Sequence, residues 1–204
     1  MSKKPIIVFE GIECSGKTYH INNVAKYLKN KNIKFIKIRE PGGSKSSEKI
    51  RKLILDHKST FNKNTDLLLY LSARSENIEL IKKNNGKKII LIDRFVDSTI
   101  AYQHYGMGIN IRLIENINNF LLRKIKINFT FLNLVNKKNM QSRFAKRKNL
   151  NRYDKFSAEF YKKVQMGFLK LFNKNPRNYM KIDSNLDILE NKKMILNKID
   201  HLIK

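Results

Sequence analysis

The chain has 204 residues, a length that predicts one domain with a core large enough to be stable without disulfides or structural metals. Its single cysteine, Cys14, excludes an internal disulfide framework and is typical of a reducing compartment. No stretch approaches the roughly 18 apolar residues that a membrane-spanning helix needs. We therefore expect a cytoplasmic protein without a membrane partner.

The formal net charge is +26, a value that often indicates nucleic-acid binding. The excess consists mostly of lysine, which is scattered along the chain together with many asparagines and isoleucines. An AT-rich coding sequence favours these three residue types, so coding bias explains the charge at least as well as a partner does. We expect no dedicated nucleic-acid partner, only weak and salt-sensitive binding to polyanions.

Short apolar runs alternate with helical patterns along the whole chain. The apolar runs are Ile6–Phe9, Ile33–Ile38, Ile89–Ile92, Phe129–Leu134 and Tyr179–Ile182. The helical patterns cover Lys17–Asn30, Ser46–Leu55, Asp66–Lys83, Ile111–Arg123, Lys137–Lys146, Ala158–Phe172 and Ile188–Ile203. This alternation predicts an α/β fold, a three-layer sandwich in which a parallel central sheet carries helices on both faces.

The first predicted strand leads into the most informative motif, Gly11-Ile12-Glu13-Cys14-Ser15-Gly16-Lys17-Thr18. It matches the phosphate-loop pattern G-x-x-x-x-G-K-[ST] at every fixed position, with Lys17 placed for the β- and γ-phosphates and Thr18 for Mg²⁺. Successive backbone N–H groups and the start of the next helix would bind phosphate. An ordinary turn is the alternative, but the flanking strand and helix favour a site for a nucleoside triphosphate.

Charged residues also follow the next two predicted strands. Arg39 and Glu40 come after the second strand, and Asp93 and Arg94 after the third. Because parallel sheets bind ligands at the carboxyl ends of their strands, this placement indicates phosphoryl transfer as well as nucleotide binding. Asp93 would hold Mg²⁺ through water and Arg94 would bind a second phosphate, with a structural ion pair as the alternative.

A second group of residues is suited to an acceptor nucleotide. Tyr70 and Arg74 are four residues apart on one predicted helix face, where an aromatic plane beside N–H donors suits a nucleobase. From this stretch alone, a core position for Tyr70 is the favoured interpretation. Arg51 is predicted on the helix after Arg39, and further polar groups that could line the same pocket belong to Ser98, Tyr102 and Gln103.

Basic residues gather late in the chain. Arg143, Lys146 and Arg147 share one face of a predicted helix, and Arg152 follows shortly after. Such a cluster is usually a solvated surface. Beside a phosphate loop, it could instead be a mobile lid, covering about residues 137–155, that closes over the transferring phosphoryl group.

Taken together, these segments resemble the thymidylate kinase family, which phosphorylates dTMP to dTDP with ATP and Mg²⁺. The resemblance runs through Phe9–Thr18, Arg39-Glu40-Pro41-Gly42-Gly43, Ser72-Ala73-Arg74, Asp93-Arg94-Phe95, Ser98, Ala101-Tyr102-Gln103 and the lid from Arg143 to Asp154. It implies a homodimer that binds ATP and dTMP. The alternatives are another nucleoside monophosphate kinase, a nucleic-acid-dependent ATPase and a nonenzymatic nucleotide-binding protein.

The resemblance also implies roles for individual residues on the acceptor side. Glu13 matches the acidic residue that contacts the 3′-hydroxyl of the acceptor sugar. Tyr70 stands where the family usually has a phenylalanine stacked on thymine. The residues that match the base-edge contacts are Arg74 and Gln103, with Ser98 and Tyr102 nearby. The residues that match the contacts to the dTMP phosphate are Arg51 and Arg94, with Arg39 in the adjoining motif.

On the donor side, the resemblance assigns the ATP phosphates to Gly11 through Thr18, with Lys17 and Arg94 among the catalytic residues. One branch of the family carries a catalytic arginine in the phosphate loop, at the position that Cys14 occupies here. The chain therefore resembles the other branch, the lid-arginine type found in many bacteria. The candidates for that arginine are Arg143, Arg147 and Arg152.

Overall fold

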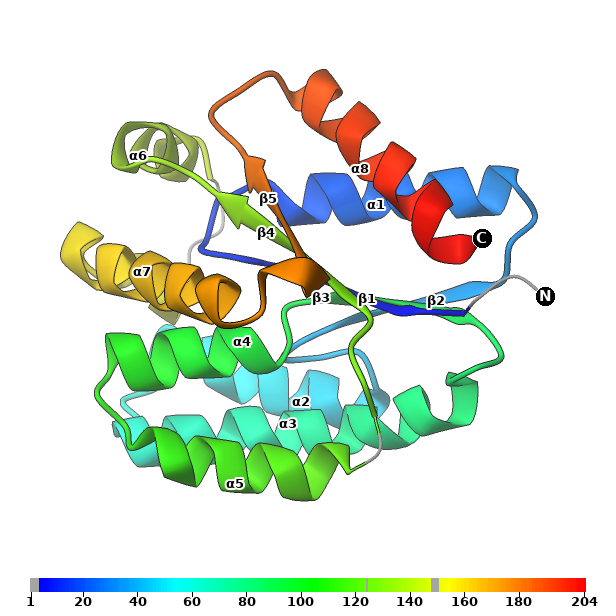
Figure 1. The fold of residues 1–204 in the computed structure, drawn as a ribbon. Coiled ribbons are helices and arrows are strands. Elements are labelled where there is room, and N and C mark those ends of the chain that lie inside the picture. The colour runs from blue at the N-terminus through cyan, green and yellow to red at the C-terminus, as the bar shows by residue number, and fades with distance from the viewer. Residues whose placement is uncertain (1–3, 124, 148–150) are drawn as a thin grey trace.

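The computed structural model describes residues 4–123, 125–147 and 151–204, so residues 148–150 of the predicted lid lie outside the described residues. Within these ranges the strands are β1 (Ile6–Gly11), β2 (Phe35–Arg39), β3 (Ile89–Asp93), β4 (Phe129–Leu134) and β5 (Tyr179–Asp183). They form one sheet in the order β2-β3-β1-β4-β5, with every neighbouring pair parallel (Figure 1). Each of the five predicted apolar runs overlaps one of these strands, because strands buried on both faces have nearly continuous apolar sequences. The second run, Ile33–Ile38, begins two residues before β2.

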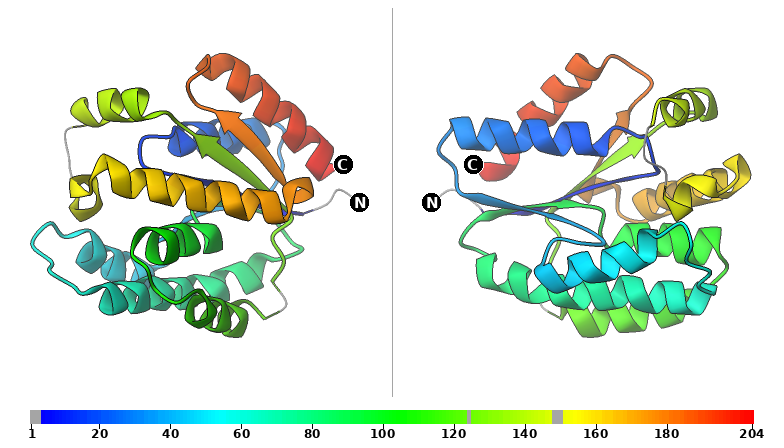
Figure 2. Two further views of the ribbon diagram at one scale, coloured as in Figure 1. Left: turned by 60° about the vertical axis from the view of Figure 1, so that its left-hand side comes forward. Right: turned by 180° about the vertical axis from the view of Figure 1, so that it is seen from behind.

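Helices cover both faces of the sheet, which confirms the predicted three-layer fold. On one face lie α1 (Lys17–Asn30) and α8 (Ile188–Ile203). On the other side lie α2 (Lys45–Leu55), α3 (Lys63–Asn84), α5 (Ile111–Leu122) and α7 (Ala158–Lys174) (Figures 1 and 2). Helix α6 (Lys137–Ala145) follows β4 at the carboxyl edge of the sheet, one residue shorter than predicted.

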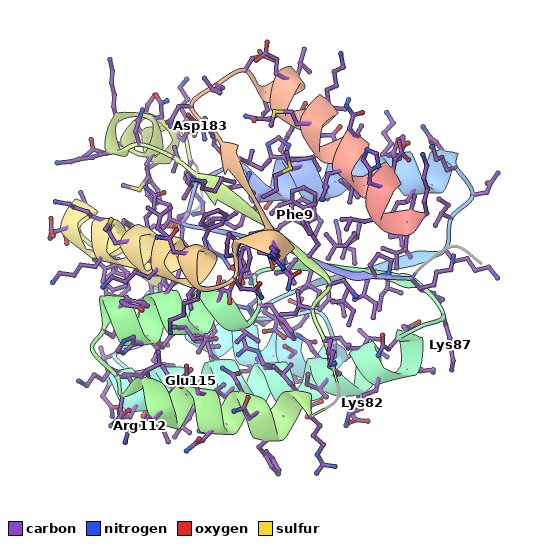
Figure 3. The ribbon with its side chains drawn as sticks, in the orientation of Figure 1. Phe9, Lys82, Lys87, Arg112, Glu115 and Asp183 are labelled. Carbon is purple, nitrogen blue, oxygen red and sulfur yellow. The ribbon has the colours of Figure 1, made fainter. Side chains whose placement is uncertain are left out.

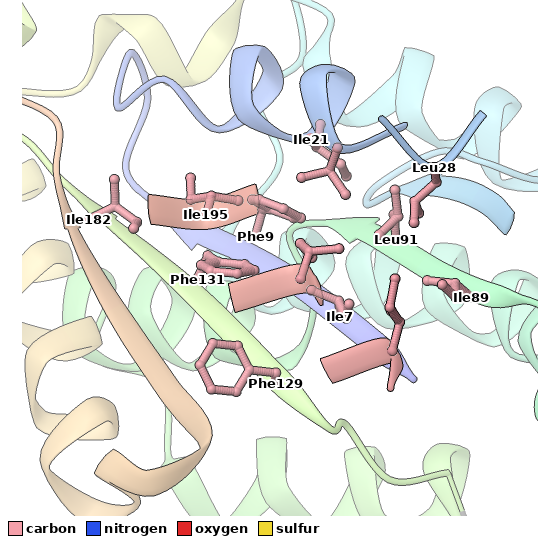
Figure 4. Packing of buried hydrophobic residues seen from close by; sticks show 13 residues of the cluster. Ile7, Phe9, Ile21, Leu28, Ile89, Leu91, Phe129, Phe131, Ile182 and Ile195 are labelled. Atoms are coloured by element: carbon pink, nitrogen blue, oxygen red, sulfur yellow. The ribbon is translucent and has the colours of Figure 1, made fainter. Parts of the chain in front are cut away.

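Two apolar layers hold β1 at the centre of the sheet. Ile7 and Phe9 point toward α1 and α8 and belong to one buried cluster (Figure 4). Ile6 and Val8 point the opposite way and belong to a second cluster with Ile78 of α3. Each fully buried side chain of this kind contributes about 1.5–3 kcal/mol. The loop that follows β1 is therefore attached to the most firmly packed strand.

One helical segment was not predicted from the sequence. After β3 the chain forms α4 (Val96–Thr99), which continues into a π-helical stretch, η1 (Ile100–Gly106). Because a π-helix has a wider turn than an α-helix, its buried residues do not follow the 3.6-residue spacing that reveals a helix in a sequence. A short 3₁₀ turn, η2 (Arg152–Lys155), and another, η3 (Pro176–Asn178), were also not predicted.

Charged side chains occupy the outer surface of many elements. Figure 3 places Lys82 and Lys87 near the α3–β3 connection and Asp183 at the end of β5, on the opposite edge of the sheet. In the described part of the chain, no helix is both long enough and apolar enough to cross a bilayer.

Candidate active site

The loop between β1 and α1 has a backbone conformation that depends on its glycines. Gly11 and Gly16 have φ angles of 137° and 87°, which residues with a side chain rarely adopt. A Cβ atom at Gly11 would lie 2.3 Å from the carbonyl oxygen of Asn133 in β4. Glycine thus allows the loop to turn tightly beside β4 and to begin α1 at the carboxyl edge of the sheet.

Lys17, the first residue of α1, is buried inside this loop. Its Nζ donates hydrogen bonds to the carbonyl oxygen of Ile12 at 2.7 Å and to Ser15 Oγ at 3.2 Å. Burial lowers the pKa of Lys17 to about 8, and the positive charge of Arg94 contributes to the shift. A polyphosphate placed beside this ammonium would favour its charged form and reverse the shift.

The back of the loop is fixed by the turn after β5 and by α6. Ser184 Oγ donates a hydrogen bond to the carbonyl oxygen of Ser15 at 2.7 Å. Arg143 donates to the carbonyl oxygens of Cys14 at 2.9 Å and Ser184 at 2.5 Å. All three hydrogen bonds are accepted by backbone carbonyl oxygens, so none of them occupies a backbone N–H group of the loop.

Thr18 and Asp93 form a pair suited to Mg²⁺. Thr18 Oγ1 donates a hydrogen bond to Asp93 Oδ2 at 3.2 Å, although 75 residues separate them in the chain. A hydroxyl and a carboxylate provide the oxygen ligands that Mg²⁺ prefers, and Mg²⁺ commonly takes its remaining ligands from water and substrate phosphates. Among the described residues no group of three or more His, Cys, Asp or Glu side chains could hold a metal.

A cavity of about 770 Å³ lies over the loop. Its lining includes Glu13 through Thr18, Arg39, Arg51, Tyr70, Asp93, Arg94, Arg143, Arg147, Asn151 and Tyr153. A second, smaller pocket of about 20 Å³ adjoins it and is lined by Glu13, Glu40, Tyr70, Arg74, Arg94, Phe95, Ser98, Thr99 and Tyr102. Both spaces are bordered by Glu13, Glu40, Tyr70 and Arg94, so a molecule in one would meet a molecule in the other at these residues.

Arg94 and Glu13 form the boundary between the large cavity and the small pocket. Arg94 donates to Glu13 Oε1 at 2.7 Å and to the carbonyl oxygen of Gly11 at 2.8 Å. Tyr102 of η1 donates its hydroxyl proton to the other Glu13 oxygen. Burial opposes ionisation of Glu13, but Arg94 and Lys17 outweigh it and lower the pKa of this carboxyl.

Glu10, which the sequence analysis did not assign to the site, fixes the segment that carries Arg94. Its carboxylate is fully buried and accepts hydrogen bonds from the backbone N–H groups of Phe95 at 2.8 Å and Ser98 at 3.2 Å, and from the Ser98 hydroxyl. Arg94 itself has a φ of 66°, a strained value for arginine. An acidic residue at the end of an otherwise apolar strand was the signal that could have revealed this role.

Glu10 also makes the stability of the protein depend on pH. Burial, followed by the neighbouring Asp97 carboxylate, raises the pKa of Glu10 to about 7 from 4.5. The folded state thus binds more protons than the unfolded state between these values, so this stabilisation is complete below pH 4.5 and is lost as pH rises through 7. For Glu10→Gln, we expect the unfolding free energy relative to wild type to rise by up to about 3 kcal/mol between pH 5 and pH 8.

Urea denaturation of both proteins at the two pH values measures this difference. Glutamine has the shape of the protonated acid and keeps an oxygen for both backbone N–H groups, so the difference at pH 5 serves as the control. A difference that stays the same at both pH values would show that Glu10 does not titrate in this range.

Arg74 is buried, and most of its N–H groups donate hydrogen bonds to other protein groups. It is 1% exposed, and it donates to Glu40 at 2.8 Å, to Asn118 at 2.6 Å, and to Thr99 Oγ1 and the carbonyl oxygen of Phe95, both at 2.9 Å. A guanidinium has five N–H donors. One N–H therefore remains for a group in the small pocket.

Arg39 and Arg51 both border the large cavity but are held differently. Arg39 binds Glu48 of α2 through two hydrogen bonds of 3.0 and 2.8 Å, and its side chain is 54% exposed. Arg51 donates to the carbonyl oxygen of Pro41 at 2.6 Å. Because an exposed ion pair adds little stability, Arg39 can exchange Glu48 for a ligand phosphate at small cost.

The structure separates the three candidate lid arginines. Arg143 and Arg147 border the large cavity, Arg143 bound to backbone and Arg147 to Asp154 at 2.6 Å. Arg152 instead binds Asp66 of α3 and does not line the cavity. Gln103 likewise lies outside both spaces, with its amide 3.4 Å from Asp66. Nothing in the sequence spacing indicated these contacts with Asp66.

Cationic side chains from several segments thus surround a cavity that a phosphate loop closes at one end, and an aromatic pocket adjoins it. This arrangement can bring two anionic molecules together and neutralise them. It places the chain in the class of phosphate-loop phosphotransferases.

Comparison with known proteins narrows this class. The thymidylate kinase family model matches residues 9–195. The chain is 38% identical over 196 residues to a thymidylate kinase of Sulfurihydrogenibium sp. (strain YO3AOP1), covering 95% of each chain. It is also 38% identical over 184 residues to a thymidylate kinase of Thermosipho africanus (strain TCF52B), covering 89% of this chain and 90% of that one. The crystal structure of a thymidylate kinase from Ehrlichia chaffeensis superposes with a TM-score of 0.78 at 31% identity, covering 96% and 98% of the two chains.

The chain therefore belongs to the thymidylate kinase family. It is an enzyme, a nucleotide kinase, and the predicted resemblance is confirmed. The phosphorylation of dTMP by ATP is the activity of that family.

Proposed function

We propose that the chain transfers the γ-phosphoryl group of ATP to dTMP, giving ADP and dTDP for dTTP synthesis, with ATP in the large cavity and dTMP in the small pocket. The observation that carries this proposal is the shared boundary, where Glu13 and Arg94 border both spaces within reach of Lys17. Two nucleotides bound there would meet phosphate to phosphate.

On the acceptor side, each part of dTMP has a partner. We assign stacking on thymine to Tyr70, and donation to a carbonyl oxygen of the base to the remaining N–H of Arg74, because both residues line the small pocket. Glu13, held by Tyr102, takes the sugar 3′-hydroxyl. The acceptor phosphate falls to Arg94 and Arg51, with Arg39 beside them. Because the small pocket holds only about 20 Å³, its side chains must move apart when the base enters.

On the donor side, the loop N–H groups and Lys17 bind the ATP phosphates. Thr18 and Asp93 would hold Mg²⁺, Thr18 through its hydroxyl and Asp93 through its carboxylate, and the oxygen donors of this pair fit the ion. Mg²⁺ there would neutralise phosphate charge. Among the described lid residues, Arg147 has the position that best suits the transferring phosphoryl group, because it borders the cavity and its one side-chain partner in this part of the chain is a carboxylate.

The reaction is a direct in-line attack of a dTMP phosphate oxygen on the γ-phosphorus, without a covalent enzyme intermediate. An acceptor phosphate is ionised at neutral pH, so no strong general base is required. The protein mainly positions two polyanions and stabilises the charge that moves between them. This demand accounts for the gathering of Lys17, Arg51, Arg94 and Arg147 around one cavity.

The proposal is tested by a coupled assay with ATP, Mg²⁺ and a panel of acceptors, dTMP, dUMP, dGMP and CMP. We expect dTMP to be the preferred acceptor and ADP release to depend on it. Preference for another monophosphate would assign a different nucleotide kinase activity. ATP hydrolysis stimulated by DNA and indifferent to dTMP would overturn the proposal.

Replacing Tyr70 by alanine tests the acceptor pocket. Loss of a base–aromatic stack costs about 1–3 kcal/mol, so we expect KM for dTMP to rise about 10- to 100-fold while KM for ATP changes little. Steady-state kinetics with each substrate varied in turn measure both constants. Tyr70→Phe keeps the ring and serves as the control; an equal rise in both KM values would mean that Tyr70 acts as a core residue.

We also propose that the enzyme is a cytoplasmic homodimer. Family resemblance supports this assembly, and so do the exposed apolar side chains of Leu53 on α2 and Leu68 on α3. Light scattering coupled to size-exclusion chromatography measures the mass in solution.

A further inference from the structure

Asp66, in the first turn of α3, connects three segments that are distant in the sequence. It is only 2% exposed. Oδ1 accepts a hydrogen bond from Arg152, while Oδ2 accepts one from the Tyr153 hydroxyl and a longer one, at 3.4 Å, from the amide of Gln103. A buried carboxylate is stable in such a place only when cations and hydrogen-bond donors surround it. The lid turn η2 supplies the two nearest donors.

The opposite side of η2 holds Arg147. Asp154 in this turn accepts the 2.6 Å bond from Arg147 with one oxygen and the 2.7 Å bond from the Asn151 N–H with the other. The Asn151 side chain in turn accepts from the Tyr153 N–H at 2.8 Å, which makes the turn a closed capping box. Asp66 therefore fixes one side of a rigid turn whose other side fixes the guanidinium that borders the cavity.

The same turn reaches the acceptor pocket through Tyr153. Its ring lies edge-to-face against Tyr70 and Tyr102, with centroid distances of 5.9 Å in both cases. Both of these rings line the small pocket. Helix α3 carries Asp66, Tyr70 and Arg74 at intervals of four residues, so a single helix face contacts both the lid turn and the base pocket.

The Arg152 side chain contacts residues on and before α3. Besides binding Asp66, its guanidinium lies 5.6 Å from the ring centre of Phe61, and its side chain is 15% exposed. A partly buried guanidinium that loses its carboxylate partner is strongly destabilised. The contacts of Arg152 thus anchor the turn to α3.

We propose that Asp66 is a positioning residue for phosphoryl transfer, which holds the lid turn η2 against α3 through Arg152 and Tyr153 and thereby places Arg147 over the phosphate loop. The inference rests on the proposed assignment of Arg147 to the transferring phosphoryl group. It assigns to Arg152 the part of an anchor that does not contact the phosphates.

The test is a double-mutant cycle of Asp66→Asn, Arg152→Gln and the double variant, with kcat and both KM values measured for each. Misplacement of a catalytic group by about 1 Å costs on the order of 10²-fold, so we expect Asp66→Asn to lower kcat about 10- to 100-fold, with far smaller changes in KM. If Arg152 is only an anchor, Arg152→Gln lowers kcat equally and the double variant is no slower than either single variant. The proposal would be overturned if the losses of kcat in the two single variants multiplied in the double variant. It would also be overturned if kcat of Arg152→Gln were far lower than kcat of Asp66→Asn.

A second measurement is independent of turnover. In Asp66→Asn, amide hydrogens of residues 151–156 should exchange faster than in wild type, because the turn loses its attachment, while those of β1 remain unchanged. Unchanged exchange in the turn would overturn the proposal. Failure of wild type to phosphorylate dTMP would refute the proposed function instead and would leave this measurement valid.

Two further variants distinguish a positioning effect on kcat from a general loss of stability. Tyr153→Phe removes one hydroxyl bond to Asp66 and keeps the ring, so we expect a smaller fall in kcat even if Asp66→Asn folds poorly. Asp200→Asn is the matched control, because Asp200 also accepts from a tyrosine hydroxyl, Tyr27 at 2.6 Å, and a cation, Lys31 at 3.1 Å, but does so between α8 and α1. The positioning role would be contradicted if Tyr153→Phe and Asp66→Asn both kept the wild-type kcat. It would also be contradicted if Asp200→Asn lost as much kcat as Asp66→Asn.

Discussion

Replacement of Lys17 by alanine is expected to lower kcat for dTMP phosphorylation by about 10³-fold or more, because it removes a preorganised donor from the β- and γ-phosphates. The ammonium is buried and donates to Ile12 and Ser15 within the loop. Burial lowers its pKa to about 8 and thus opposes the charged form, so its loss should not lower the stability of the fold. Steady-state kinetics together with the thermal midpoint separate these two effects.

Lys17→Arg is the appropriate control for charge. The guanidinium keeps a positive charge but is a planar fork, so it does not reproduce the compact donor that the Lys17 ammonium places inside the loop. We expect this variant to remain folded and well below wild type in kcat. Turnover near wild type in a folded Lys17→Ala protein would contradict the assignment of the phosphate loop.

The strands and the phosphate loop could be predicted from the sequence because both depend on local patterns. Parallel strands buried on both faces appear as apolar runs, and the glycines at 11 and 16 are required by positive φ angles within the loop itself. The placement of Arg39 and Arg94 followed from the carboxyl-end rule for parallel sheets. Arg39 is the last residue of β2 and Arg94 directly follows β3, and the carboxyl ends of these two strands share one edge of the sheet.

The contacts that sequence reasoning missed all join residues that are far apart in the chain. Glu10 reaches across 85 residues to Phe95, and Asp66 reaches across 86 to Arg152. No spacing rule indicates such pairs. For Gln103, the prediction of a base contact rested on resemblance, and the structure places its amide beside Asp66 and Tyr153 instead of in either space. The Oε1 atom of Gln103 is buried and has no hydrogen-bond partner among the described residues. Its contact with the base stays a prediction.

Tyr70 illustrates how tertiary structure decides between two local interpretations. From its own stretch it reads as a core residue, and it does pack against the buried cluster that contains Tyr102 and Tyr153. It also borders both the large cavity and the small pocket. The residue therefore has a core contact and also borders the space that we propose for the base.

The lid arginines can be distinguished by what each one binds. Arg143 uses two N–H groups on backbone carbonyl oxygens behind the phosphate loop, and Arg152 is anchored to Asp66. Within the described residues, the side chain of Arg147 binds Asp154 alone; it is 38% exposed and borders the cavity. A guanidinium held by a single hydrogen bond to a carboxylate can shift to a phosphate, where its planar fork allows a bidentate contact.

Arg147→Ala is therefore expected to lower kcat by about 10³-fold or more, in the range of an arginine that stabilises a phosphoryl-transfer transition state, with a much smaller change in KM for dTMP. Asp154 is buried and would lose its cationic partner, so the thermal midpoint must be measured beside kcat. Arg147→Lys keeps the charge without the planar fork, and partial recovery of kcat in that variant would show that charge and geometry both contribute. A change confined to KM for dTMP would move the catalytic role to Arg143 or Arg152, and for Arg152 it would also remove the basis on which Asp66 is assigned a positioning role.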